Sequence, residues 1–137
     1  MKRILLLTAF LAVVSASLAQ NESTTDRIPI LLRLDDIGMC HSVNMAAKQV
    51  LETGLTVSMS VMVPCPWFTE AVEILKQYPN VSVGIHLTLN AEWKNYRWGP
   101  VSGASVVPSL VDSMGHFFPS RSKLFGNNPK LGEIESE

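Results

Sequence analysis

The sequence has little net charge of either sign and no run of lysine or arginine residues. Its 137 residues include 11 Lys and Arg against 12 Asp and Glu, so the formal net charge is -1 at pH 7. Proteins that follow the phosphate backbone of a nucleic acid need clustered positive charge. The composition therefore argues against nucleic acid as a partner.

Long apolar runs are also absent after the N-terminus, so no later segment is expected to span a membrane. Residues 1–3 are positively charged, residues 4–14 are apolar, and residues 17–19 have the small side chains of a cleavage site. This order predicts a secretory signal peptide over residues 1–19 and an exported protein, periplasmic or secreted. Residues 20–27 are polar and predict a flexible mature N-terminus. We expect no membrane attachment after signal cleavage.

Cysteine is scarce, with Cys40 and Cys65 as the two thiols of the chain. An oxidising compartment permits a disulfide between them. The sequence does not supply the geometry that a disulfide requires. Free, partly buried thiols are the favoured alternative.

Residues 28–137 predict one domain in which strands and helices alternate. Runs rich in aliphatic and β-branched residues predict strands at 31–35, 56–63 and 81–89. Helical spacing of apolar residues predicts one helix from an N-cap at Ser42 to a C-terminal cap at Gly54, and a second over 68–78. This order favours an α/β fold with parallel strands joined by right-handed helical crossovers.

Alternating side chains divide each predicted strand into an aliphatic face and a smaller, more polar face. The wall of a barrel with a functional interior shows this pattern. A sheet covered by helices on both sides would have two apolar faces. The pattern therefore favours a (β/α) barrel.

Two adjacent carboxylates, Asp35 and Asp36, end the first predicted strand. Functional groups gather beyond the carboxyl ends of parallel strands, and adjacent carboxylates repel unless a proton or a cation lies between them. His86 shares a strand face with Asp35, which favours a metal site for Zn²⁺ or Mg²⁺. The Asp36 side chain falls on the opposite face of the strand, so the backbone must bend at the strand end if both carboxylates are to face one ion. Gly38, two residues later, makes such a bend easy. The alternatives are solvated loop carboxylates and a core histidine.

An aromatic loop follows the third predicted strand. Trp93, Tyr96 and Trp98 are candidates to stack on sugar rings, and Arg97 is a candidate to bind an anion or a carbonyl group. The alternative is that Trp93 and Trp98 cover the core. Next, residues 110–112 and 116–118 predict the arms of a hairpin with its turn at 113–115. From Pro119 onward the composition is polar and does not clearly predict helices.

Taken together, these residues resemble the YdjC/ChbG-like carbohydrate deacetylases from about residue 28 to about residue 125. The matching motifs are Arg33-Leu34-Asp35-Asp36-Ile37-Gly38-Met39, Val43-Asn44, Gly54-Leu55-Thr56-Val57-Ser58, Val61-Met62-Val63-Pro64, Val83-Gly84-Ile85-His86-Leu87-Thr88-Leu89, Pro108-Ser109-Leu110-Val111-Asp112 and Gly115-His116-Phe117. The resemblance implies a NodB-like, irregular (β/α) barrel. It also implies a divalent metal ion and removal of N-acetyl groups from amino sugars or chito-oligosaccharides. Asp35 would be the general base, and Asp36 and His86 would be metal ligands.

The family's later histidine motif, which completes the metal site, and its remaining barrel strands do not occur in this chain. We therefore expect the N-terminal part of such a barrel, with two metal ligands, one fewer than catalytic zinc usually has, and no turnover by the chain as given. His116 is not expected to reach the ion. The alternative function is a non-catalytic remnant that at most binds carbohydrate through its aromatic loop. An uncovered strand edge and apolar face also predict self-association.

Overall fold

The computed structural model describes residues 28–137. Residues 31–137 form one compact unit, and residues 28–30 of the preceding unit have no regular secondary structure. The predicted signal peptide, residues 1–19, and the predicted flexible segment, residues 20–27, lie outside the described residues. None of the helices in the described part of the chain has the length and apolar character needed to cross a membrane.

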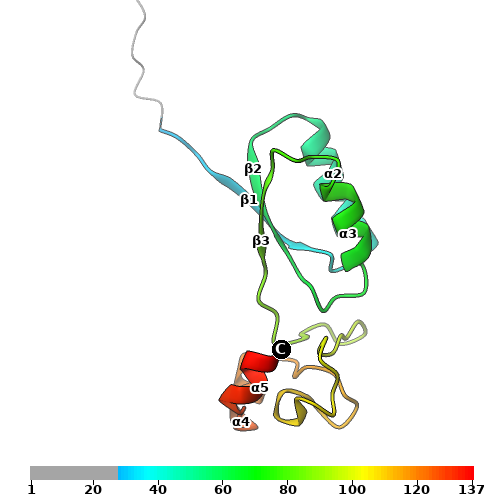
Figure 1. The fold of residues 1–137 in the computed structure, drawn as a ribbon, viewed down its shortest axis with the longest axis vertical. Helices are drawn as coiled ribbons and strands as arrows, with labels where there is room; N and C mark the ends of the chain where they lie inside the picture. The colour runs from blue at the N-terminus through cyan, green and yellow to red at the C-terminus, as the bar shows by residue number, and fades with distance from the viewer. Residues whose placement is uncertain (1–27) are drawn as a thin grey trace, which may run out of the picture. The chain divides into compact units, whose positions relative to one another are not determined.

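Strands and helices alternate in the first half of the described chain, in the order β1 (Leu32–Ile37), α2 (His41–Glu52), β2 (Val57–Val61), α3 (Phe68–Leu75) and β3 (Ser82–Ile85). The three strands are parallel and lie in the order β1-β2-β3. Both helices cover the same face of this sheet (Figure 1). The predicted α/β class with parallel strands and helical crossovers is confirmed.

The first hydrophobic core lies between the sheet and its two helices. Its buried members are Ile37, Ala47, Leu51, Val57, Met59, Val61, Ala71 and Ile74. Met59 comes from the middle strand and is among the largest fully buried side chains. Full burial of such a side chain stabilises a fold by about 1.5–3 kcal/mol. The core thus holds in place the strand ends next to Asp36 and His86.

Several predicted boundaries differ from the structure, since β1 ends at Ile37, β2 spans Val57–Val61 and α3 ends at Leu75, and two of the differences concern the site. Helix α2 begins at His41 with Cys40 as its N-cap, and the Ser42 hydroxyl contacts the Cys40 sulfur at 3.1 Å instead of capping the helix. Strand β3 ends at Ile85 rather than at residue 89. Its partner strand β2 ends at Val61, which pairs with Ile85, so the residues of the chain after Ile85 have no strand residue opposite them.

Strand β3 is exposed along its whole length. Its aliphatic residues Val83 and Ile85 border a groove with Phe68, Val72 and Leu75 of α3, with a volume of about 440 Å³. Ile85 remains 73% exposed in this groove. The predicted aliphatic face is therefore present on β3 and only partly covered by helix.

Residues 86–137 pack around a second hydrophobic core. Its buried members are Met62, Cys65, Ala91, Trp98, Val107, Leu110, Phe117 and Leu124. This part contains the short 3-10 helix η1 (Pro108–Leu110) and an antiparallel bridge between Val111 and Phe117. The bridge and the hydrogen bond from the Asp112 amide to the His116 carbonyl, 2.8 Å long, confirm the predicted hairpin.

Two helices follow Pro119, where the sequence did not clearly predict any. Helix α4 (Arg121–Gly126) is capped by the Ser120 hydroxyl, which accepts from the Lys123 amide at 3.3 Å. Helix α5 (Leu131–Ser136) is held by Glu133, whose carboxylate accepts from the Ser109 amide at 2.7 Å. Six residues are too few to show a helical period, and tertiary contacts stabilise both helices.

Candidate metal and substrate site

A bulge in β1 sets the direction of the Asp36 side chain. Between Leu34 and Ile37 the pairing with β2 advances by two residues on β2, from Met59 to Val61, while β1 advances by three. The extra residue reverses the alternation of side chains. Asp36 adopts a left-handed conformation, with φ of 64°, which Asp tolerates better than most residues. The predicted bend is therefore in the backbone of Asp36 itself.

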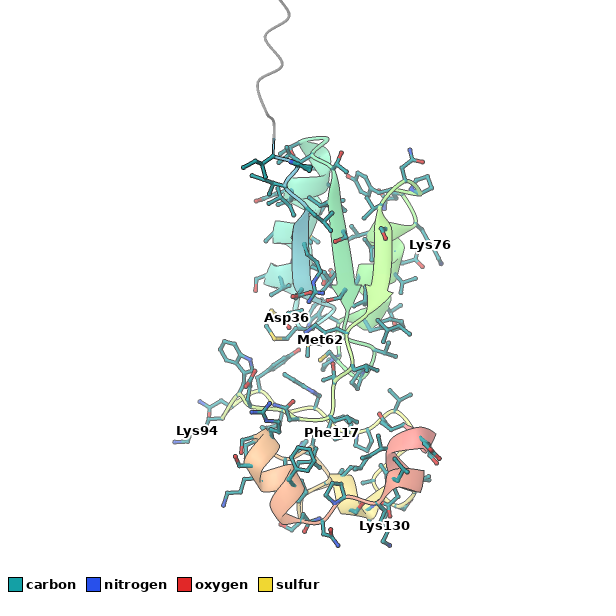
Figure 2. All side chains as sticks on the ribbon, turned by 90° about the vertical axis from the view of Figure 1, so that its left-hand side faces the viewer. Asp36, Met62, Lys76, Lys94, Phe117 and Lys130 are labelled. Carbon is teal, nitrogen blue, oxygen red and sulfur yellow. The ribbon has the colours of Figure 1, made fainter. Side chains whose placement is uncertain are left out.

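His86 lies against Asp36 at this end of the sheet. Its Nε2 atom is 3.3 Å from Asp36 Oδ1, and both side chains are partly exposed. Its Nδ1 atom lies 3.3 Å from the Leu87 carbonyl oxygen, so the two ring nitrogens face different groups. In Figure 2, Asp36 and Met62 mark the end of the sheet where this pair lies.

Asp35 is held by partners from its own strand and from β2. Arg33 donates from Nε to Oδ1 at 2.8 Å and from its terminal nitrogen to Oδ2 at 2.8 Å. The Ser60 hydroxyl donates to Oδ1 at 2.6 Å. The Arg33 hydrogen bonds and then the Ser60 hydrogen bond lower the pKa of Asp35, so its carboxylate stays charged.

Asp36 and His86 fit as two neighbouring ligands of one metal ion. A metal with N and O ligands at about 2.0–2.2 Å holds adjacent donor atoms roughly 3 Å apart, close to the observed spacing. Within residues 28–137, however, no three His, Cys, Asp or Glu side chains are placed to share an ion. Asp36 and His86 could thus supply two of the ligands of a metal ion, and the described residues place no third His, Cys, Asp or Glu beside them. The metal role of both residues stays a prediction.

A small polar cavity of about 130 Å³ opens beside the Asp36–His86 pair. Its lining comprises Asp36, Met39, Met62, His86, Leu87, Thr88, Asn90, Glu92, Trp93 and Trp98. Asn90 and Glu92 are polar residues that the sequence analysis did not single out. Trp93 is 55% exposed at this cavity and is available to a ligand.

Tyr96, Arg97 and Trp98 of the aromatic loop are engaged within the protein. The Tyr96 hydroxyl donates to the Met39 carbonyl at 2.6 Å. Arg97 pairs with Asp112 at 3.0 Å and also donates to the Phe117 carbonyl. Trp98 is only 4% exposed and belongs to the second core. Arg97 therefore binds an anion of the chain itself, and Trp98 covers the core, as the alternative interpretation proposed.

The segment that carries Trp93 is fixed at both ends to the hairpin. The Ala91 amide donates to the Phe118 carbonyl at 2.9 Å, and the Phe117 amide donates to the Trp98 carbonyl at 3.0 Å. Ala91 and Phe117 are fully buried. The hairpin thus positions one wall of the cavity.

Asn44 is a buried polar residue that the sequence analysis quoted without giving it a role. Its Oδ1 accepts from the Gly38 amide at 2.8 Å, next to the Asp36 turn. Its Nδ2 donates to the Trp67 carbonyl at 3.0 Å and to Glu70 Oε2 at 2.8 Å. Asn44 shares the buried stripe of α2 with Ala47 and Leu51. A polar residue in line with the apolar residues of a helix is expected to be buried and hydrogen-bonded, and this pattern in the sequence could have identified Asn44.

Both cysteines are free, as the favoured alternative predicted. Cys65 is buried in the second core, and burial raises the pKa of its thiol to about 12. Cys40 is partly exposed, and the Ser42 hydroxyl lowers the pKa of its thiol.

Comparison with known proteins extends over nearly all the described residues. The model of one protein family, described as YdjC-like protein, matches residues 29–137. A carbohydrate deacetylase of Brevibacillus brevis is 33% identical over 108 residues, which is 79% of this chain and 40% of that protein. A carbohydrate deacetylase of Enterococcus faecalis is 28% identical over 109 residues, 79% of this chain and 39% of that protein.

One solved structure has a similar fold. It is the crystal structure of an Enterococcus faecalis protein named for cellobiose-phosphate cleavage, with a TM-score of 0.66 and 28% identity. The similarity covers 78% of this chain and 40% of that one. The chain thus spans about 40% of the length of these relatives.

Proposed function

Because the chain belongs to the family of YdjC-like proteins, we propose that Asp35, Asp36 and His86 belong to the active site of a metal-dependent hydrolase. Its substrates are N-acetylated amino sugars or chito-oligosaccharides, from which it removes acetyl groups. Relatives named carbohydrate deacetylases support this substrate class. The predicted signal peptide supports an exported protein, periplasmic or secreted.

The observation that carries the proposal is the contact between Asp36 and His86. Their donor atoms lie 3.3 Å apart at the carboxyl end of a parallel sheet and open onto a polar cavity. Asp36 Oδ1 and His86 Nε2 would hold the divalent metal, Zn²⁺ or Mg²⁺. When bound, the metal supplies a Lewis acid that polarises the acetamido carbonyl group.

Asp35 is the proposed general base. Its Oδ1 atom accepts from both Arg33 and Ser60, whereas Oδ2 accepts from Arg33 alone. Each carboxylate oxygen has two lone pairs, so Oδ2 keeps one for the proton of an attacking water. Arg33 and Ser60 also fix the plane of the carboxylate. Asp35 therefore accepts the proton at Oδ2 without changing its side-chain conformation.

The cavity beside Asp36 and His86 suits a polar, uncharged ligand. Asn90 and Glu92 contribute hydrogen-bonding groups to its lining, and Trp93 adds a partly exposed aromatic ring. Aromatic rings pack well against the apolar faces of sugars. In this proposal Trp93 is the aromatic substrate contact, since Tyr96 and Arg97 hydrogen-bond within the protein and Trp98 is buried in the second core.

A second function, carbohydrate binding without hydrolysis, is supported by one observation. In the described part of the chain, Asp36 and His86 have no third His, Cys, Asp or Glu placed to share a metal ion with them. Catalytic zinc usually has three protein ligands. The cavity and Trp93 would serve this function equally well.

An acetate-release assay separates the two functions. A version of the protein extended by the family's later histidine motif and remaining strands is loaded with Zn²⁺ or Mg²⁺, incubated with N-acetylglucosamine oligomers, and compared with a sample held in chelator, since no turnover is expected of the 137-residue chain itself. The proposal predicts metal-dependent acetate release that Asp35→Asn abolishes, with Glu73→Gln on the exposed side of α3 as the matched control. Release that persists in Asp35→Asn contradicts the assigned base. A folded protein that binds the oligomers and releases no acetate has the second function.

A further inference from the structure

Trp67 and His41 form a partly exposed aromatic pair near the proposed active site. Their ring centroids are 5.2 Å apart, and the ring planes are inclined by 45°. The Trp67 side chain is 40% exposed in the loop after β2, and His41 begins α2 in the turn after β1. These two connections leave the same end of the sheet (Figure 1).

The Trp67 backbone is tied to the turn that carries Asp36. Its amide donates to the Gly38 carbonyl at 3.1 Å, and its carbonyl accepts from Asn44 Nδ2 at 3.0 Å. The Gly38 amide in turn donates to Asn44 Oδ1. The backbone of Trp67 is therefore held in a fixed position relative to Asp36.

The His41 ring is fixed by a carboxylate. Its Nδ1 atom lies 2.7 Å from Glu70 Oε1, while Glu70 Oε2 accepts from Asn44 Nδ2 at 2.8 Å. Among the residues that the structure describes, no group hydrogen-bonds to His41 Nε2. The His41 side chain is more than half exposed, so a ligand can reach this nitrogen from solvent.

The pair is joined through the backbone to the lining of the cavity at Asp36 and His86, because the Trp67 amide donates to the Gly38 carbonyl and the next residue, Met39, lines that cavity. His41 follows Met39 two residues later. An indole face beside an oriented imidazole and a carboxylate offers an apolar platform together with hydrogen-bonding groups. Both Glu70 oxygens already have partners in His41 and Asn44, so the groups left for a ligand are the indole face and His41 Nε2, which suit a neutral polyhydroxyl ring.

We propose that Trp67 and His41 form a second sugar subsite, which holds a pyranose ring next to the one bound at Asp36 and His86. This proposal rests on the proposed function, because it extends the same oligosaccharide along the protein surface. The indole of Trp67 stacks on the apolar face of the ring. His41 Nε2 hydrogen-bonds a ring hydroxyl.

Isothermal titration calorimetry of the full chain with N-acetylglucosamine and with its trimer tests the subsite. Chelator is present, so that binding is measured without turnover. We expect Trp67→Ala to weaken trimer binding about tenfold and to leave monomer binding unchanged, because stacking on one ring is lost. We expect Trp67→Phe to retain most of the affinity. Phe125→Ala, which removes an exposed aromatic ring on α4, is the matched control and should have no effect.

The outcomes distinguish this proposal from the proposed function. Trimer binding by Trp67→Ala equal to that of the wild type overturns the subsite and leaves the proposed function in place. Equal loss of monomer and trimer affinity also overturns it, since Trp67 would then contact the first ring. A wild-type chain that binds neither sugar overturns both. If Trp67→Ala does not fold, His41→Ala replaces it, with a smaller trimer-specific loss expected and equal trimer affinity counting against the subsite.

Discussion

His86 meets Asp36, with Nε2 3.3 Å from Oδ1, even though a regular strand would direct Asp36 away from the face that Asp35 and His86 share. The bulge after Leu34 and the positive φ of Asp36 bring its carboxylate to the histidine. The backbone irregularity is therefore what assembles the pair. A left-handed non-glycine residue of this kind is often found at functional sites.

Separate roles for the three residues predict different effects on metal content. In a version extended by the family's later histidine motif, Asp35→Asn should abolish turnover and retain the metal, because the proposed base is lost and the ligands remain. His86→Ala should lower both the metal content and the rate, by about 10-fold or more in metal affinity if a direct ligand is removed. Metal analysis after dialysis measures the content. Equal metal loss in the two variants would make Asp35 a ligand.

Asn44→Ala should destabilise the fold and loosen the Asp36 turn. The substitution leaves the Gly38 amide and the Trp67 carbonyl without their buried partner, which costs about 1–3 kcal/mol for an unsatisfied group. Urea unfolding followed by circular dichroism measures the change. Asn80→Ala, at an exposed position, should change stability by less than about 0.5 kcal/mol. Similar values for the two variants would rule out a special role for Asn44.

Asp112 should make the fold less stable in acid. Burial alone would raise its pKa, but the amides of Met114 and His116 together with Arg97 lower it below the ordinary 3.8. A lowered native pKa stabilises the fold above the unfolded value, and this contribution is lost as the pH falls through the native pKa. Urea midpoints between pH 7 and pH 3 should therefore decline less steeply in Asp112→Asn. Parallel curves for wild type and variant would contradict this linkage.

The two thiols should react with iodoacetamide at very different rates. Cys40 is partly exposed and has a lowered pKa, whereas Cys65 is buried with a pKa of about 12. Because the thiolate is the reactive form, one equivalent should react at pH 8 in the native protein and a second only in urea. Peptide mass spectrometry identifies the modified residue. Modification of Cys65 at the same rate would show that its surroundings open readily.

The sequence was sufficient to predict the parallel order of strands and helices, because apolar spacing differs clearly between the two element types. It also predicted the proximity of Asp36 and His86, which the structure confirms as a contact, and the hairpin that joins Val111 and Phe117. Each of these depends on local patterns. Strand parity and turn residues act over a few positions and are visible in the sequence.

Other features depended on contacts between distant segments. Arg97 pairs with Asp112, fifteen residues later, and Trp98 is buried by the second core, so neither orientation can be read from the aromatic loop alone. The short helices α4 and α5 depend on a cap at Ser120 and a contact from Glu133 to Ser109. The polar residues Asn90 and Glu92 join the cavity only because the chain folds back over the sheet end.

The anchoring of the Trp93 segment has an entropic consequence for ligand binding. Hydrogen bonds at Ala91 and Trp98 fix both ends of the segment when the protein folds, so much of its backbone freedom is lost before any ligand arrives. Ordering of a loop upon association otherwise reduces affinity. The conformational entropy of the Trp93 segment is therefore lost mainly when the protein folds, and little more is lost when a ligand binds against Trp93.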